Sequence, residues 1–182
     1  MQKLCAVLIL LIFATTPVLA RPSSQPVPRI APGWEVSEWF NSKGFDLVEL
    51  KGRVVVIEFF QLWCPGCNAF SIPLLKEWHG TFEGELATGA LKIVSIHTVF
   101  EGFDYQSPDR LRRFLKRKKI LHPVGVDRAI PGQRLPRTMR RWGTMGTPEV
   151  AIVDKKGIVR FQEFGGFDPR SAEALIRKLL KE

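Results

Sequence analysis

The sequence predicts an α/β fold with a mixed central sheet flanked by helices on both faces. Apolar runs of strand length alternate with segments in which apolar residues recur every three or four positions, as in amphipathic helices. Near the C-terminus, Asp154-Lys155-Lys156-Gly157 separates two further apolar runs, which indicates a β-hairpin. The expected order of elements is β-α-β-α-(β)-α-β-β-α, which is typical of a layered α/β domain.

The first half of the chain supplies two apolar strands and the helix between them. Residues 34–50 carry scattered aromatic side chains and a turn-like sequence at 41–44, which leads into a short edge strand. Residues 54–62 are almost continuously apolar, as in a strand buried on both faces, and residues 91–99 form a second such strand. Between them, Phe70, Leu74 and Trp78 recur at four-residue spacing and predict a helix over residues 65–79.

The second half supplies further helices and the hairpin. Ser107 is a suitable N-cap for a helix over residues 108–119, because Pro108 suits the first helical position and the basic residues at 116–119 suit a helix C-terminus. A short strand around Val124 and a helical turn over residues 133–142 follow. Residues 149–153 and 158–164 form the hairpin, and Asp168 caps a final helix.

The N-terminus divides into a leader and a linker. Residues 1–20 have the form of a secretory signal peptide, with Lys3, an apolar stretch over residues 4–14, and small residues at Val18 and Ala20 for cleavage. Residues 21–33 are a proline-rich linker, and residues 34–182 form one domain. We therefore expect a periplasmic or otherwise exported protein. Retention of the leader as a membrane anchor is the alternative, and contact with a membrane is expected only in that case.

The most informative motif is Trp63-Cys64-Pro65-Gly66-Cys67, at the predicted junction of a strand and a helix. Outside the leader these are the only two cysteines, so the pair cannot staple distant loops of an exported scaffold. The attacking species in disulfide exchange is a thiolate. Cys64 lies where the helix begins, and the free backbone N–H groups there favour negative charge, so Cys64 is the candidate nucleophile. Cys67, one turn further in, is the candidate resolving thiol.

The order of motifs resembles the thioredoxin-like superfamily, and within it the TlpA/ResA-like exported thiol-disulfide oxidoreductases. The resemblance covers residue 34 to the C-terminus. It depends on the tryptophan before the first cysteine, on Pro73 within the following helix, on Gly146-Thr147-Pro148 before the hairpin, and on Trp39-Phe40-Asn41. It implies a thioredoxin fold and a redox-active cysteine pair.

The resemblance also implies roles for residues outside the motif. Glu58 would be a buried acid beneath the disulfide that exchanges a proton with Cys67; the alternative is a strand-end carboxylate that reaches water. A cis Thr147–Pro148 bond would let Thr147 offer its backbone to an extended substrate beside Cys64; the alternative is an ordinary trans bond. Trp63 would belong to the substrate surface, or else form an aromatic rim of the core.

Two features depart from this family. Many of its members carry an acid in the first turn after the second cysteine, whereas residues 68–71 contain none. The dipeptide between the cysteines, Pro65-Gly66, helps to set the reduction potential, but its effect cannot be calculated from sequence. The direction of electron flow is therefore open, and the resemblance favours a reductant.

The charge of the chain is strongly positive, with a net charge of +9. Between residues 110 and 141 there are twelve basic residues and one acid, Asp127. This region is either a patch for an acidic partner or an anionic membrane surface, or simply a solvated helix face. Nucleic acid is not an expected partner, because no aromatic residues are interleaved with the basic ones.

These features together predict an exported, monomeric thiol-disulfide oxidoreductase that acts on protein thiols or disulfides and has a redox partner protein. We expect no cofactor and no metal, because His79, His97 and His122 are interpreted as surface or hydrogen-bonded residues. The alternative is a metal- or partner-binding module that uses the same fold without turnover. A peroxidase of the peroxiredoxin type is disfavoured, since neither cysteine follows a Thr-x-x sequence.

Overall fold

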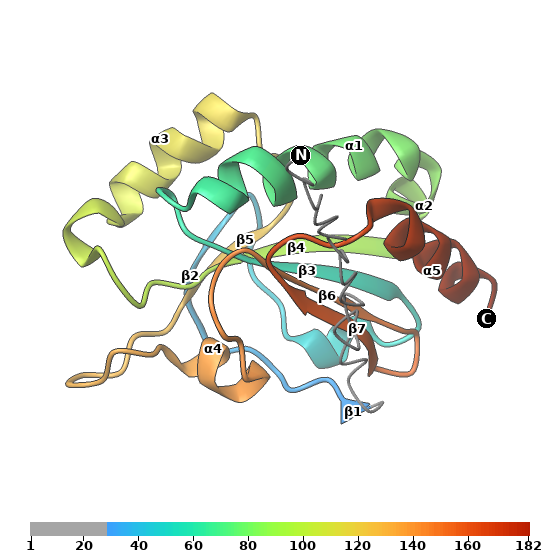
Figure 1. The fold of residues 1–182 in the computed structure, drawn as a ribbon. Coiled ribbons are helices and arrows are strands. Elements are labelled where there is room, and N and C mark those ends of the chain that lie inside the picture. The colour runs from blue at the N-terminus through green and yellow to red at the C-terminus, as the bar shows by residue number, and fades with distance from the viewer. Residues whose placement is uncertain (1–28) are drawn as a thin grey trace, which may run out of the picture.

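The computed structural model describes residues 29–182, so the predicted signal peptide and residues 21–28 of the linker lie outside the described residues. Seven strands in this part of the chain form one mixed sheet, in the order β1-β7-β6-β3-β4-β5-β2 (Figure 1). The strands are β1 Arg29–Ile30, β2 Val36–Phe40, β3 Val54–Phe60, β4 Leu91–His97, β5 Val124–Asp127, β6 Glu149–Val153 and β7 Ile158–Phe164.

Five α-helices accompany the sheet within residues 29–182: α1 Ile72–Thr81, α2 Glu83–Thr88, α3 Pro108–Lys118, α4 Arg137–Trp142 and α5 Pro169–Lys181. A π-helical turn, Cys67–Ser71, precedes α1, and short 3-10 turns cover Leu47–Leu50 and Phe103–Tyr105. None of the helices described is long and apolar enough to cross a membrane.

The centre of the sheet is parallel and its two sides are antiparallel. β3 pairs in parallel with β4, and β4 pairs in parallel with β5, while the hairpin β6–β7 joins β3 in the antiparallel direction. Each parallel connection contains a helix, as the geometry of parallel strands requires. The register of β3 and β4 places Glu58 opposite Ser95, so both side chains point to the same face of the sheet.

Helices cover both faces, as predicted. α1, α3 and α5 lie on one face, and α4 lies on the other (Figure 1). Successive side chains of β3 point to opposite faces of the sheet, and this explains the division. Val54 and Val56 pack with residues of α1 and α5, whereas Val55 and Ile57 pack on the opposite face with Trp142 of α4. Because β3 is buried on both faces, its sequence reads as a continuous apolar run, with Glu58 as the exception.

Two N-terminal segments differ from the expectations from sequence. The edge strand precedes the turn at 41–44 instead of following it, since β2 pairs with β5 and the chain after the turn forms the 3-10 turn Leu47–Leu50. Leu47 and Leu50 are three positions apart, so a 3-10 turn buries both in the core, which an alternating strand could not do. In addition, Arg29–Ile30, within the segment expected to be a linker, pairs with β7.

The predicted start of the helix over residues 108–119, which is α3 in the structure, is confirmed. The Ser107 side chain accepts a hydrogen bond from the backbone N–H of Arg110, and Pro108 occupies the first turn of α3. Leu111, Phe114 and Leu115 are buried against the sheet, and the basic residues lie along the remaining surface of the helix.

Candidate active site

The two cysteines form a disulfide between the end of β3 and the helical segment that leads into α1. Cys64 is 6% exposed, whereas Cys67 is completely buried. The backbone N–H of Cys67 points at Sγ of Cys64 at 3.0 Å. A donor in this position stabilises a thiolate, so after reduction Cys64 is both the more accessible and the better stabilised sulfur.

Asn68 holds the loop that carries Cys64. Its side-chain amide donates to the backbone carbonyls of Leu62 and Cys64, at 3.0 Å each, and its backbone N–H donates to the same Cys64 carbonyl at 3.1 Å. Asn68 is the first residue after the second cysteine, and it lies in the turn where many TlpA/ResA-like proteins carry an acid. The position therefore has a structural use in this chain, because it fixes the reactive loop to the start of the helix.

A surface hollow of about 270 Å³ lies beside Cys64. Trp63, Met145 and Phe164 line it, and all three are unusually exposed for large apolar side chains, at 53%, 81% and 49%. Thr147 also lines the hollow, so the structure brings Trp63, Cys64 and Thr147 together as the sequence suggested. Exposed apolar side chains gathered around a depression are typical of a surface that binds another protein.

Pro148 lies directly against the loop between the cysteines. The Thr147–Pro148 bond is cis, as expected. A Cβ atom added to Gly66 would lie 2.8 Å from Cδ of Pro148, closer than two carbon atoms can approach. The second residue between the cysteines must therefore be glycine for the loop and Pro148 to pack as they do. This contact explains the glycine of the Pro65-Gly66 dipeptide.

Glu58 is buried beneath this region and does not reach water. Its side chain is 1% exposed, and its two oxygens accept hydrogen bonds from Ser71 at 2.5 Å and from Ser95 at 2.7 Å. Burial raises the pKa of Glu58, and the two serine hydrogen bonds offset that effect only in part. Ser71 lies one turn after Cys67 on the same helical segment, which places the carboxyl on the cysteine side of the sheet. The alternative of a strand-end carboxylate in water is therefore wrong.

The three histidines are hydrogen-bonded, which is one of the two alternatives expected from the sequence. His122 is buried and connects two groups: its Nε2 lies 2.7 Å from Oγ of Ser95, and its Nδ1 lies 3.0 Å from Nε2 of His79. His97 is also buried, and its Nε2 lies 3.1 Å from the side-chain oxygen of Gln106. Burial lowers the pKa of His97 to about 4 and that of His122 to about 3.

Ser71 and Ser95 were not singled out from the sequence, and His122 was interpreted only as a surface or hydrogen-bonded residue. Ser95 is the one polar residue in the middle of the second apolar strand, and this was the available signal. Its significance depends on the register of β3 and β4, which places it opposite Glu58. His122 approaches only because β5 lies beside β4, and nothing in the local sequence indicates that contact.

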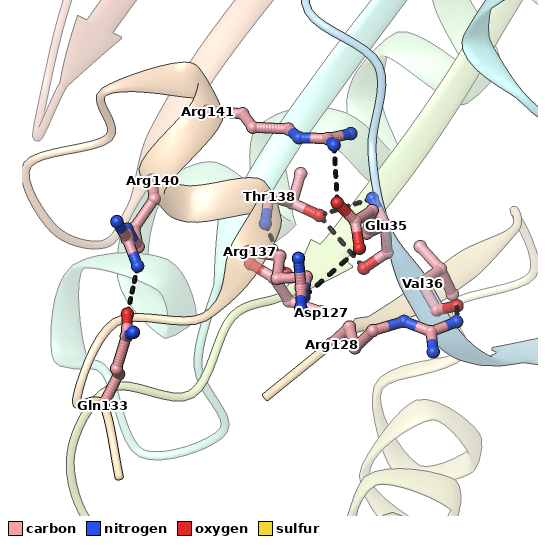
Figure 2. Close-up of polar contacts among 9 residues, drawn as sticks. All are labelled: Glu35, Val36, Asp127, Arg128, Gln133, Arg137, Thr138, Arg140 and Arg141. Carbon is pink, nitrogen blue, oxygen red and sulfur yellow. Dashed lines mark hydrogen bonds and ion pairs between the residues drawn. The ribbon is translucent and has the colours of Figure 1, made fainter. Parts of the chain in front are cut away.

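The basic region divides into two parts that behave differently. In the part around α4, Glu35 forms ion pairs with two arginines, Arg137 at 3.3 Å and Arg141 at 2.6 Å (Figure 2). Asp127 accepts a hydrogen bond from the backbone N–H of Thr138 at 2.7 Å. Burial raises the pKa of Asp127, and the hydrogen bonds that it accepts from Thr138, Met139 and Thr98 oppose the effect. The charges of this part therefore tie α4 to the strand β5 and to the segment before β2.

The α3 part presents its charges to solvent. A second hollow, of about 350 Å³, is lined by Trp63, Tyr105 and three arginines of α3, Arg110, Arg113 and Arg117. None of these arginines has a carboxylate partner among residues 29–182. Trp63 lines both hollows, so the basic one adjoins the one at Cys64.

Within the described part of the chain, no three His, Cys, Asp or Glu side chains are grouped in a way that could hold a metal ion. Glu58, Ser95, His122 and His79 are hydrogen-bonded to one another in a line.

Solved structures with this architecture place the chain in a known class. It is similar to a thioredoxin-like superfamily protein, with 37% identity, a TM-score of 0.79, and coverage of 84% of this chain and 97% of that one. It is also similar to a thiol-disulfide isomerase from Corynebacterium glutamicum, with 34% identity, a TM-score of 0.77, and coverage of 85% and 97%. The fold is the thioredoxin fold, and with its Cys64–Cys67 pair the protein is a thiol-disulfide oxidoreductase.

Residues 27–162 match the model of the AhpC/TSA family, and the chain belongs to this family. Among curated proteins it is similar to Protein DipZ of Mycobacterium bovis and of Mycobacterium tuberculosis, with 27% identity over 150 residues in each case. The match covers 81% of this chain, but the chain spans only about a fifth of the length of these relatives.

Proposed function

We propose that this protein works outside the cytoplasm as a dithiol reductant of protein disulfides, with Cys64 as the attacking and Cys67 as the resolving sulfur. The observation that carries the assignment of roles is the unequal environment of the two sulfurs. Cys64 lines the hollow and receives the Cys67 N–H, whereas Cys67 is completely buried. The signal-peptide pattern of residues 1–20 supports export, and the TlpA/ResA-like motifs support the reductive direction.

The reaction then proceeds through two exchanges. The Cys64 thiolate attacks one sulfur of the substrate disulfide, that S–S bond breaks, and the other substrate sulfur leaves as a thiolate that takes a proton from water. Cys67 next loses its proton to the Glu58 carboxylate and attacks Sγ of Cys64, which releases the second substrate thiolate. Two electrons have passed to the substrate, and a dithiol of the redox partner protein must return them to the Cys64–Cys67 disulfide.

Glu58 suits the role of proton acceptor because it is sealed from water and its pKa is raised by burial. A carboxyl in this state holds and releases protons closer to neutral pH than one in water. Glu58→Gln keeps the size of the side chain and its ability to bond both serines, but removes the titrating group. Exchange rates that are the same in both proteins across neutral pH would exclude this role.

The substrate surface is proposed to consist of Trp63, Thr147 and Pro148 around the hollow at Cys64. Thr147 lines the hollow within a loop that precedes β6, where its backbone is available to an extended substrate chain. The neighbouring basic hollow, with Arg110, Arg113 and Arg117, favours substrates or partners that carry acidic residues close to their cysteines.

Mixed-disulfide trapping tests this function. Cys67→Ser is expected to accumulate covalent complexes between Cys64 and its substrates in an exported compartment, because the resolving attack is lost. Cys64→Ser is the matched control and should trap nothing. In parallel, equilibration of the wild-type pair with glutathione buffers should give a reversible two-electron couple. No trapped complexes and no reversible couple, together with tight copper or zinc binding by the reduced form, would favour the non-catalytic binding module instead.

A further inference from the structure

Four side chains form a continuous hydrogen-bonded line from beneath the disulfide toward the surface. Ser95 Oγ lies 2.7 Å from Oε2 of Glu58 and 2.7 Å from Nε2 of His122. Nδ1 of His122 in turn lies 3.0 Å from Nε2 of His79. Every gap is of hydrogen-bond length. The members come from four separate segments, β3, β4, the chain before β5, and α1, so only the tertiary structure assembles them.

The line connects the interior to the surface. Glu58, Ser95 and His122 are buried, whereas His79 is half-buried on α1. Glu58 has no ion pair with a lysine or arginine among residues 29–182, so no charged neighbour fixes its ionisation. A proton that reaches the carboxyl from Cys67 needs a route out, and the line supplies one that needs no water in the core.

The imidazoles are in the state that such a route requires. Burial, the neighbouring His79 and the positive charge of Lys92 on β4 together lower the pKa of His122 to about 3, and burial is the largest cause. Burial also lowers the pKa of His79. Both rings are therefore neutral at neutral pH, and a neutral imidazole donates through one nitrogen while it accepts through the other. The pairing of His79 and His122 through one nitrogen each is consistent with this state.

We propose that Ser95, His122 and His79 relay protons between Glu58 and solvent during disulfide exchange. The proposal depends on the role of Glu58 given above. After Cys67 protonates Glu58, the carboxyl O–H gives its proton to Ser95, Ser95 gives its own to Nε2 of His122, and Nδ1 of His122 gives one to Nε2 of His79. His79 then releases a proton from Nδ1 to water. One proton enters and one leaves, and the reverse sequence reprotonates Glu58.

His79→Gln separates a relay from a structural contact. The glutamine side chain can still hydrogen-bond Nδ1 of His122, through its carbonyl oxygen or its amide according to the tautomer, but it cannot pass a proton through itself. With reduced protein and oxidised glutathione in stopped flow, we expect release of the second glutathione to slow about tenfold at neutral pH. This is less than the roughly 10²–10⁴-fold that an acid or base at the reacting group contributes, because His79 acts on Glu58 only through His122 and Ser95. The first release and the equilibrium with glutathione should not change. Lys76→Gln, at an exposed position on the same helix, is the matched control and should behave as wild type.

Chemical rescue provides the second readout. His79→Ala opens the outer end of the line, so added imidazole should restore the rate of the second release. The same imidazole should not rescue Glu58→Gln, because the acceptor inside is missing. A normal rate in His79→Gln, or a slow His79→Ala that imidazole does not rescue, overturns the relay. If Glu58→Gln itself is as fast as wild type, the role of Glu58 fails first, and the relay fails with it.

Discussion

The burial of Glu58 predicts that this residue makes folding stability depend on pH, and Glu58→Gln measures the effect. Both side chains have similar size, and glutamine can bond Ser71 and Ser95 in place of the carboxyl. In the unfolded chain Glu58 ionises around its ordinary pKa of 4.5, whereas burial raises its pKa in the folded protein. Between these two values the unfolded state has released the proton and the folded state has kept it.

The sign and size follow from proton linkage. Because the unfolded state binds fewer protons in this interval, the free energy of unfolding of the wild type falls as pH rises, by up to about 1.4 kcal/mol per pH unit. Glu58→Gln has no such titration. The stability of Glu58→Gln relative to wild type should therefore be near zero around pH 4 and should increase with pH until the folded carboxyl ionises.

Urea unfolding of the oxidised forms between pH 4 and pH 8 measures this difference. The disulfide is then the same in both proteins. Other shifted groups, such as Asp127 and Glu149, are present in both and cancel in the difference. A difference that stays constant between pH 5 and pH 8 would refute the reasoning, because it would mean that the folded carboxyl titrates as it does in water.

Two further predictions concern the surroundings of the cysteines. Gly66→Ala should lower the free energy of unfolding by about 1–3 kcal/mol in chemical denaturation, because its Cβ would lie 2.8 Å from Pro148 Cδ. Gly80→Ala, which meets no atom within 4 Å, should be neutral or slightly stabilising; equal losses in both would contradict the packing argument. Arg113→Glu should lower kcat/KM for an acidic peptide disulfide about five- to tenfold at low ionic strength, and salt should abolish the difference. Arg112→Glu makes the same charge change on α3, outside the basic hollow, and an equal loss there would show that only net charge matters.

The class of protein was predictable from local sequence. Periodicity predicted the strands 54–62 and 91–99, the hairpin around residues 154–157, and the helix that follows the cysteines, and the structure confirms each of them within a few residues. These elements are predictable because an apolar strand or an amphipathic helix encodes its own burial pattern. The edge strand before residue 41 and the pairing of Arg29–Ile30 were missed, because short edge strands depend on the partner strand more than on their own residues.

The sequence by itself determined the reactive pair, its place between a strand and a helix, and the suspicion that an acid within an apolar strand has a function. Only the tertiary structure decided what surrounds Glu58. Ser95 approaches it through strand register, His122 through the position of β5, and His79 through the packing of α1 on the sheet. These contacts join residues from 27 to 43 positions apart in the chain. Local sequence cannot specify such distances, because they are fixed only when the strands pair and the helix packs against them.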